Sequence, residues 1–157
     1  MFNDPAIQEL LQDLHSPDEK KRQQATARLW QIWFSQKGDT GLEALRRSQF
    51  LIEMGEIQQA ENILNKLVES YPDFAEARNQ RAIFYYSQNQ FEKSKQDCQK
   101  VVELNPNHFG AWHGLGLCYV ALEQFNQAIN AFQKALSIQP YATINQKLIL
   151  ECTMHLN

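Results

Sequence analysis

Apolar residues recur along most of this chain at the three- and four-residue spacing of amphipathic helices. From residue 41 to residue 142 the helical segments come in pairs, and a proline follows each pair. Gly55, Asn89 and Glu123 interrupt the pattern between the two helices of a pair. The pattern therefore predicts antiparallel helix hairpins and no β-strand in this part of the chain.

The hairpins are copies of one repeat. Pro72, Pro106 and Pro140 stand thirty-four residues apart, and proline forces the chain out of a helix. Small and large residues recur in phase upstream of each proline. The small columns are Ser48, Ala82 and Gly116, and Ala60, Ser94 and Ala128; the large columns include Leu51, Tyr85 and Tyr119, and Leu64, Cys98 and Phe132. Small side chains let two helices approach closely and large ones fill the space toward the next hairpin, so we expect the hairpins to stack.

These columns resemble the tetratricopeptide repeat (TPR), whose pattern is Trp, Leu, Gly, Tyr, Ala, Phe, Ala and Pro. The third copy matches at every position: Trp112, Leu115, Gly116, Tyr119, Ala128, Phe132, Ala135 and Pro140. The first two copies depart at the two leading positions, where they carry Ala44 and Arg47, and Arg78 and Arg81. The resemblance implies an all-α fold, a right-handed superhelical stack of about nine helices that binds other proteins.

The resemblance divides the chain into five segments. TPR 1 covers residues 41–74, TPR 2 residues 75–108 and TPR 3 residues 109–142, and residues 143–157 form a capping helix. Residues 1–40 precede the repeats and are expected to form a further hairpin. Such end segments cover the apolar surfaces that the first and last repeats otherwise expose.

The segment 1–40 predicts two helices. One begins at Pro5; for the other, Ser16 is the expected N-cap and Pro17 lies in the first turn. The segment loosely resembles a HEAT repeat hairpin in Leu10, Leu11, Ser16, Pro17, Asp18, Arg22, Ala25 and Ala27. Near its end, Trp30, Trp33 and Phe34 form an aromatic cluster. We interpret the hairpin as a cap over the exposed end of TPR 1; the alternative is an aromatic docking patch for a partner.

Arg81 stands where an apolar residue is usual in a TPR. A buried guanidinium group requires a partner, and Asp97 on the second helix of the same hairpin is the candidate. TPR 3 carries apolar Leu115 and Ala131 at the two matching positions. We therefore predict an Arg81–Asp97 ion pair with a structural role. The run Asn79-Gln80-Arg81-Ala82 also resembles a variant common in bacterial TPRs, which suggests a bacterial source.

In TPR proteins the second, fifth, ninth and twelfth positions of each unit point into a concave groove. The resemblance places these residues there: Leu42, Leu45, Gln49, Ile52, Glu76, Asn79, Ile83, Tyr86, Gly110, His113, Leu117 and Val120. We expect a partner peptide or helix to bind Gln49, Ile52, Asn79, Ile83, Tyr86, His113 and Leu117, with Lys147 and Glu151 of the closing helix. Asn79, Tyr86 and His113 are the strongest candidates, because polar side chains on an open face have less structural reason to be there.

The best-known ligand scheme of the family is a clamp of Lys, Arg and Asn that holds the carboxylate of a chaperone's C-terminus. This scheme requires basic residues at several groove sites, where the present chain carries Leu45, Glu76, Gly110 and Gly114. The sequence therefore argues against a chaperone tail as the ligand. The groove instead combines apolar patches with a few polar side chains, which suits an amphipathic helix or an extended segment.

Composition narrows the classes of partner. Fifteen basic and eighteen acidic residues give a net charge of −3 without a cluster of Lys or Arg, so we expect no nucleic-acid binding. No apolar run approaches the roughly 18 to 20 residues of a membrane span, and the start of the chain lacks a secretory signal pattern. The three cysteines are an odd number without CxxC spacing, which indicates reduced thiols and a cytoplasmic protein.

Catalytic and metal-binding patterns are missing from the sequence. It contains no glycine-rich phosphate loop and no HExxH or GxSxG motif. The four histidines, His15, His108, His113 and His155, are scattered over different segments rather than spaced as metal ligands. We therefore predict no enzyme activity, no cofactor and no metal.

Two functions remain. The first is a TPR adaptor, or an assembly or co-chaperone-like scaffold, that binds another protein in its groove. The alternative is a structural role in self-association, with a homodimer formed through the end helices or through the Trp30, Trp33 and Phe34 cluster.

Overall fold

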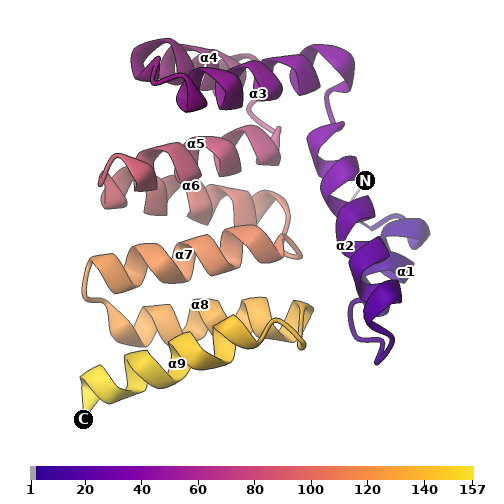
Figure 1. Cartoon of the computed structure of the whole chain (residues 1–157), viewed down its shortest axis with the longest axis vertical. Coiled ribbons are helices and arrows are strands. Elements are labelled where there is room, and N and C mark those ends of the chain that lie inside the picture. The colour runs from indigo at the N-terminus through magenta and orange to yellow at the C-terminus, as the bar shows by residue number, and fades with distance from the viewer. Residues whose placement is uncertain (1–2) are drawn as a thin grey trace.

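The computed structural model describes residues 3–157, and over this range the chain folds into nine α-helices without a β-strand. Their bounds are α1 Pro5–Asp13, α2 Glu19–Phe34, α3 Gly38–Glu53, α4 Ile57–Ser70, α5 Ala75–Ser87, α6 Phe91–Leu104, α7 Phe109–Ala121, α8 Phe125–Ile138 and α9 Thr143–Leu156. The predicted all-α stack of helix hairpins is confirmed (Figure 1). Met1 and Phe2, the first residues of the expected segment 1–40, lie outside the described residues. Within the described range, every helix is too short or too polar to cross a lipid bilayer.

Three helix pairs, α3 with α4, α5 with α6 and α7 with α8, lie in successive layers, and α9 closes the stack against α8 (Figure 1). The small residues of the repeat lie where the helices of a pair cross. Ala60, Ser94 and Ala128 are buried there, and at Gly116 a β-carbon would collide with the ring of Phe132. The two helices of a pair approach this closely only because these side chains are small.

The turn within each pair has the same backbone conformation. Gly55, Asn89 and Glu123 adopt positive φ angles of 79°, 59° and 58°. A residue in the left-handed region ends the first helix and reverses the chain. Glycine adopts this conformation at no steric cost, and asparagine does so more readily than glutamate. The breaks predicted at these three positions are confirmed.

Arg81 and Asp97 join the two helices of the middle pair. Arg81 donates two parallel hydrogen bonds to the Asp97 carboxylate, from Nε to Oδ2 and from Nη2 to Oδ1, each of 2.7 Å. A third hydrogen bond runs from its Nη1 to Oδ1 of Asn65 on α4, at 3.1 Å. The hydrogen bonds with Asp97 raise the pKa of Arg81 above its ordinary value, although burial acts in the opposite direction. This pair, which the comparison of repeats predicts, therefore holds α4, α5 and α6 together.

Aspartate side chains fix where α1 and α2 begin. Asp4 Oδ1 accepts a hydrogen bond from the backbone N–H of Ala6 at 2.8 Å, and Asp18 Oδ1 accepts one from Lys20 at 3.0 Å. The second helix thus starts after Asp18 and not after Ser16, which the sequence suggested as its cap. Ser16 Oγ instead accepts from the backbone N–H of Asp18 at 3.1 Å and shapes the preceding turn.

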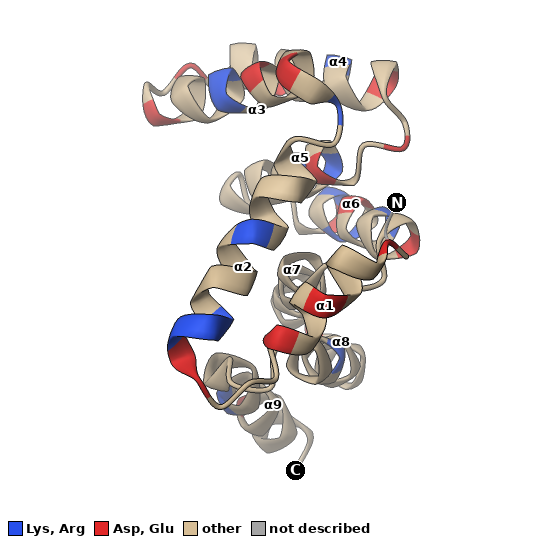
Figure 2. Ribbon diagram, turned by 90° about the vertical axis from the view of Figure 1, so that its right-hand side faces the viewer, with Lys and Arg blue, Asp and Glu red and all other residues tan. Residues whose placement is uncertain are grey.

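The N-terminal hairpin does not extend the stack. Helix α2 runs across the layers near the first residues of α5 and α7, with α1 beside it (Figures 1 and 2). Its apolar residues form one cluster with Phe109 of α7 and Ile138 of α8; they are Ile7, Leu14, Ala25, Leu29 and Trp33. The expectation of a cap over TPR 1 does not hold. The outer face of α3 stays uncovered, with Phe50 59% and Met54 63% exposed.

Aromatic packing explains where the hairpin lies. The Trp33 ring stacks on His108, with centroids 4.4 Å apart and an interplanar angle of 20°. The Trp30 ring meets Phe109 edge-on at 5.4 Å. Gly110 leaves room for this contact, because a β-carbon there would lie 2.7 Å from the Trp30 ring. The aromatic cluster therefore docks on the repeats of its own chain, more than seventy residues away in sequence.

Candidate partner-binding groove

Helix α2 divides the expected groove into a covered part and an open part. Helices α3, α5, α7 and α9, to which the TPR resemblance assigns the groove, lie on one side of the stack, and α2 passes near their N-terminal ends (Figure 2). In the covered part, Glu76 is 0% and Asn79 3% exposed. Gly110 lies against the ring of Trp30. Of the inward positions near the helix starts, Leu45, Glu76 and Asn79 are therefore buried, whereas Leu42 and Gly110 are half-buried.

A fully hydrogen-bonded polar cluster lies beneath α2. Glu76 Oε1 accepts hydrogen bonds from Asn79 Nδ2 at 3.0 Å and from Gln80 Nε2 at 2.8 Å. Its Oε2 lies 2.8 Å from Nε2 of His108, whose side chain has no solvent exposure. The backbone N–H of Ala111 donates to His108 Nδ1 at 3.0 Å. A buried carboxylate is tolerated when donors surround it in this way.

These contacts select the tautomer of His108. Because Nδ1 accepts the hydrogen bond from Ala111, it carries no proton, and the ring proton is on Nε2. Nε2 then donates to Glu76. In this arrangement His108 acts as the N-cap of α7 and as a donor to α5 at once. The cluster is a structural joint beneath the tryptophans rather than a set of free groove side chains.

The structure corrects the expectation for Asn79, one of the three strongest candidates for partner contact. Its side chain is buried and bonded to Glu76, so it is not available to a partner. The Glu76–His108 pair was not found by sequence reasoning. Gly110 could have indicated that another segment packs here. A groove position without a side chain leaves space for a large ring of another segment.

Five apolar side chains at positions that the TPR resemblance assigns to the groove are accessible to solvent, and they are grouped as one strip. Ile83 is 56% and Tyr86 36% exposed on α5. The other residues of the strip are half-buried: Ile52 on α3, and Leu117 and Val120 on α7. Lys147 and Glu151 of α9 are exposed at its far end. Ile83, Tyr86, Ile52, Leu117 and Val120 are called the apolar strip below.

Two predicted polar contacts already have partners within the chain. His113 Nδ1 lies 2.8 Å from Oδ1 of Asn145, which joins α7 to α9. Gln49 Nε2 donates to Oε1 of Gln80 at 3.2 Å and joins α3 to α5. Both residues are half-buried rather than enclosed. They hold neighbouring helices together at the edge of the open part, so their side chains are not free to turn toward a partner without losing these bonds.

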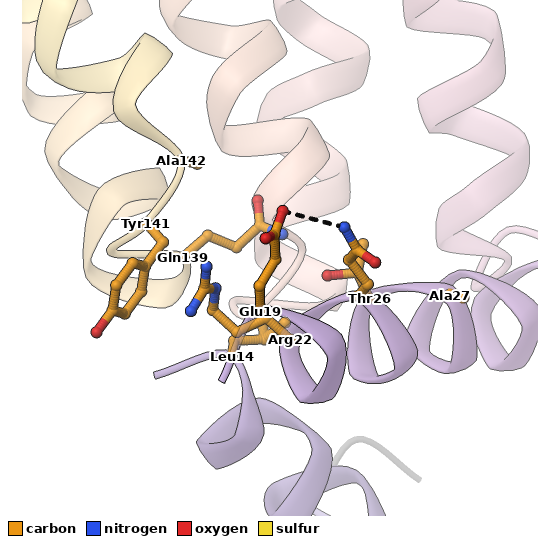
Figure 3. A pocket seen from close by; sticks show the side chains of 9 residues that line it. Leu14, Glu19, Arg22, Thr26, Ala27, Gln139, Tyr141 and Ala142 are labelled. Atoms are coloured by element: carbon orange, nitrogen blue, oxygen red, sulfur yellow. Dashed lines mark hydrogen bonds between the residues drawn. The ribbon is translucent and has the colours of Figure 1, made fainter. Parts of the chain in front are cut away.

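Hollows flank α2 at both ends. A cavity of about 280 Å³ lies between α2 and α3, and its lining includes Trp30, Phe34, Leu42 and Arg46. A second cavity of about 390 Å³ lies between the start of α2 and the turn before α9 (Figure 3). In the second cavity the Arg22 guanidinium group lies 3.9 Å from the centroid of the Tyr141 ring. Both cavities are shared between α2 and the repeats.

The described residues do not gather their thiols and other metal-binding groups into a metal site. No three His, Cys, Asp or Glu side chains converge there as a metal site requires. Cys98, Cys118 and Cys152 are free and buried. A hydrogen bond with Cys118, together with burial, raises the pKa of the Cys98 thiol well above its ordinary value. Such a thiol packs as a small apolar group.

Comparison with known families identifies the repeats. The family model for "Anaphase-promoting complex, cyclosome, subunit 3" matches residues 53–135, which include most of the three helix pairs. The chain belongs to this family of TPR proteins. No curated protein matches it in sequence over any part of its length.

Solved TPR structures share the fold at low sequence identity. The first TPR of Spaghetti (RPAP3) bound to an HSP90 peptide is 19% identical, with a TM-score of 0.70 over 73% of this chain and 91% of that one. The TPR2B domain of yeast Sti1 in a complex with an Hsp70 peptide is 16% identical, with a TM-score of 0.65 over 72% and 95%. The structural match to MamA AMB-1 covers 95% of this chain and 79% of that one, at 19% identity and a TM-score of 0.67.

Proposed function

We propose that this chain is a non-enzymatic interaction module, an adaptor or assembly scaffold that holds an apolar segment of another protein in the open part of its groove. The observation that carries the proposal is the exposure of Ile83 and Tyr86 in the apolar strip, at positions that the TPR resemblance assigns to the groove. Exposed apolar side chains gathered on a concave face are typical of partner-binding surfaces. The peptide complexes of structurally similar TPR domains support the same class of function.

The ligand we propose differs in chemistry from the chaperone peptides of those two complexes. Leu45 and Glu76, which occupy sites where the clamp requires basic residues, are fully buried. Gly110, at a third such site, is covered by Trp30. A carboxylate placed there would meet the Glu76 carboxylate without a cation to offset the repulsion. We therefore propose an apolar segment as the ligand, and not an acidic C-terminus.

A cytoplasmic location and a bacterial-type repeat are part of the proposal. The three free, buried thiols support a reducing compartment. The Asn79-Gln80-Arg81-Ala82 run supports the bacterial-type repeat, since Arg81 is used in a part-buried ion pair with Asp97. Fractionation of the source cells tests the location: enrichment with the cytoplasmic marker is expected, and enrichment in the extracellular fraction would contradict it.

Affinity capture tests the proposal. The full-length protein is immobilised, and proteins retained from a native lysate are quantified by mass spectrometry against the Ile83→Asp/Tyr86→Ala variant. Both substituted side chains are exposed, so the fold is retained. A true partner is expected to fall about tenfold or more with the variant. The matched control is Gln96→Asp on an exposed position of α6, which leaves capture unchanged. Equal capture by all three proteins contradicts groove binding.

Self-association through the end helices is a second candidate, and one observation favours it. Both ends of the stack expose large apolar side chains: Phe50 on α3 and Met54 just after it, and Leu150 at 66% and Met154 at 74% on α9. Within the aromatic cluster, Trp33 is not available for a homodimer because it is buried against His108, whereas Trp30 and Phe34 are half-buried and line a cavity. Sedimentation velocity over a hundredfold concentration range tests this candidate. A constant monomer mass removes it, and a mass that rises with concentration and is restored to the monomer by Phe50→Ser supports it.

A further inference from the structure

Two thiols meet at the junction between TPR 2 and TPR 3. Cys98 lies on α6 and Cys118 on α7, and both belong to one buried cluster. The Cys98 Sγ atom packs against α7 one turn before Cys118, since a β-carbon at Gly114 would lie 3.4 Å from it. A hydrogen bond joins the two thiols directly. The proposed groove uses neither of them.

The same two repeat positions meet wherever the second helix of one repeat packs on the next helix of the stack. From the first junction to the last, the paired residues are Leu64 and Phe84, Cys98 and Cys118, and Phe132 and Cys152. The members of each pair pack in one buried cluster. Of these three junctions, the middle one has a thiol on both sides. The contact between the thiols therefore follows from the repeat geometry itself.

A directed chain of hydrogen bonds distinguishes the two thiols. Ser94 Oγ donates its single proton to the carbonyl oxygen of Ala82 at 2.7 Å, so Cys118 Sγ is the donor in its 3.1 Å contact with Ser94 Oγ. The hydrogen bond with Cys98 lowers the pKa of Cys118, against the effect of burial. The same bond raises the pKa of Cys98. Cys118 therefore loses its proton more readily and is the nucleophile of the pair.

A hollow in the surface leads toward these thiols. A cavity of about 260 Å³ lies between α7 and α8. Part of its lining packs in the same cluster as Cys98 and Cys118: Trp112, Leu115, Tyr119 and Ala131. The cavity admits a molecule the size of water or hydrogen peroxide. Small shifts of the lining side chains bring such a molecule to the thiols, whereas a protein oxidant is excluded.

We propose that Cys98 and Cys118 are an oxidation site, at which a hydroperoxide converts the two thiols into a reversible disulfide that joins TPR 2 to TPR 3. The inference goes beyond the proposed function and does not depend on it. Disulfides in a reducing compartment are typically transient and redox-sensing. A cross-link at this junction fixes the separation of α6 and α7, and hence the packing of one repeat on the next.

The reaction proceeds in two steps. The Cys118 thiolate attacks one oxygen of hydrogen peroxide, so that an S–O bond forms and the O–O bond breaks. The released hydroxide takes up the proton that Cys118 lost and becomes water. The Cys98 sulfur then attacks the Cys118 sulfur, an S–S bond forms, and the hydroxyl group leaves with the Cys98 proton as a second water. The two thiols lose two electrons, and the peroxide is reduced to two waters.

Counting the free thiols tests the site on the full-length protein. The folded protein is treated with a small excess of hydrogen peroxide while circular dichroism monitors its helicity. It is then unfolded in iodoacetamide, and mass spectrometry counts the alkylated cysteines, which number three in the untreated chain. Tryptic peptides locate any linkage. Cys98→Ala and Cys118→Ala remove one thiol of the pair. Cys152→Ala is the matched control, because Cys152 is as buried as Cys98 but packs against Phe132.

The treated wild type is expected to take up one alkyl group, on Cys152, and to contain a Cys98–Cys118 linkage that dithiothreitol reverses. Cys152→Ala is expected to form the same linkage, and the other two variants none. Because the cross-link restricts the unfolded chain, the Tm of the wild type is expected to rise by about 5 °C or more. Three alkyl groups on the treated wild type overturn the site, as does a linkage through Cys152 or between two chains. A Tm that falls on linkage also overturns it. The groove function stands or falls separately.

Discussion

His108 Nε2 lies 2.8 Å from Oε2 of Glu76, and neither side chain is exposed to solvent. This contact joins the start of α7 to the start of α5, and the Trp33 ring of α2 rests on it. Three structural segments therefore meet at one imidazole ring. The same contact explains why the groove is only partly open, since it gives α2 a flat, fully hydrogen-bonded surface on which to pack.

Replacement of His108 by Ala tests this joint. The change removes the N-cap of α7, a hydrogen-bond donor to Glu76 and the ring beneath Trp33. Because a buried carboxylate loses a partner, we expect the free energy of unfolding to fall by about 3 to 5 kcal/mol. His108→Asn restores the N-cap alone, and a smaller loss is expected. Urea denaturation measures both variants, with His15→Ala at an exposed position as the control. A loss below about 1 kcal/mol for His108→Ala contradicts the structural role.

The difference between TPR 2 and TPR 3 suggests a test of the Arg81–Asp97 pair. Asp97→Ala leaves the part-buried guanidinium group of Arg81 without its main partner, and we expect a loss of about 1 to 3 kcal/mol in the free energy of unfolding. TPR 3 carries Leu115 and Ala131 at the matching positions. The double variant Arg81→Leu/Asp97→Ala copies that apolar solution, so its loss is expected to be smaller than that of Asp97→Ala alone.

A double-mutant cycle tests this pair. It compares the thermal and urea unfolding of the wild type, Arg81→Leu, Asp97→Ala and the double variant. A double variant that loses the sum of the two single effects contradicts a direct coupling between Arg81 and Asp97. A double variant that is more stable than Asp97→Ala shows that an ion pair and an apolar pair are interchangeable at this repeat position.

The repeats were predictable from sequence because their determinants are local. Proline spacing, the small residues at helix crossings and the left-handed turn residues all recur within thirty-four positions. The Arg81–Asp97 pair was predictable for a related reason. Both residues belong to one hairpin, and the corresponding hairpin of TPR 3 lacks both charges.

The position of α2 was not predictable in the same way. The contact between Trp33 and His108 joins residues seventy-five positions apart, with no repeat to relate them. Groove positions were assigned by analogy with an open stack, and Asn79 was therefore placed on a free surface. The ring that covers Gly110 comes from a segment outside the repeat, whose amphipathic pattern predicts a helix but does not determine where its apolar face packs.

Lys37 and Asp73 form an ion pair near the N-terminal hairpin, and this pair makes a pH-dependent contribution to the free energy of unfolding. Lys37 Nζ lies 2.7 Å from Asp73 Oδ2, and this hydrogen bond lowers the pKa of Asp73 below its usual value. A carboxyl group whose pKa is lower in the folded state stabilises the fold above its unfolded pKa. That contribution is lost as the pH falls through the folded pKa. The exposed pair is screened by water, so the effect is small.

We therefore expect Asp73→Asn to be slightly less stable than the wild type near pH 7, and the difference to vanish near about pH 2. Urea denaturation at both pH values measures the difference, and high salt is expected to reduce it. Glu69→Gln, at an exposed position of α4, is the control. A difference that persists unchanged at the lower pH shows that Asp73 acts through something other than its charge.

The Gly110→Ala variant tests whether α2 can be loosened from the repeats without changing the stability of the repeats themselves. Alanine favours the helical state over glycine by up to about 1 kcal/mol, so α7 itself is not weakened. Its β-carbon would lie 2.7 Å from the Trp30 ring, and the ring must move away. We expect hydrogen exchange of backbone amides in α1 and α2 to become faster, while exchange in α5 to α8 stays as in the wild type. Gly114→Ala is the matched control, since its β-carbon meets Cys98 Sγ at an ordinary 3.4 Å. Unchanged exchange in α2, or equal acceleration throughout the chain, contradicts the packing of Trp30 against Gly110 as the contact that holds the hairpin in the groove.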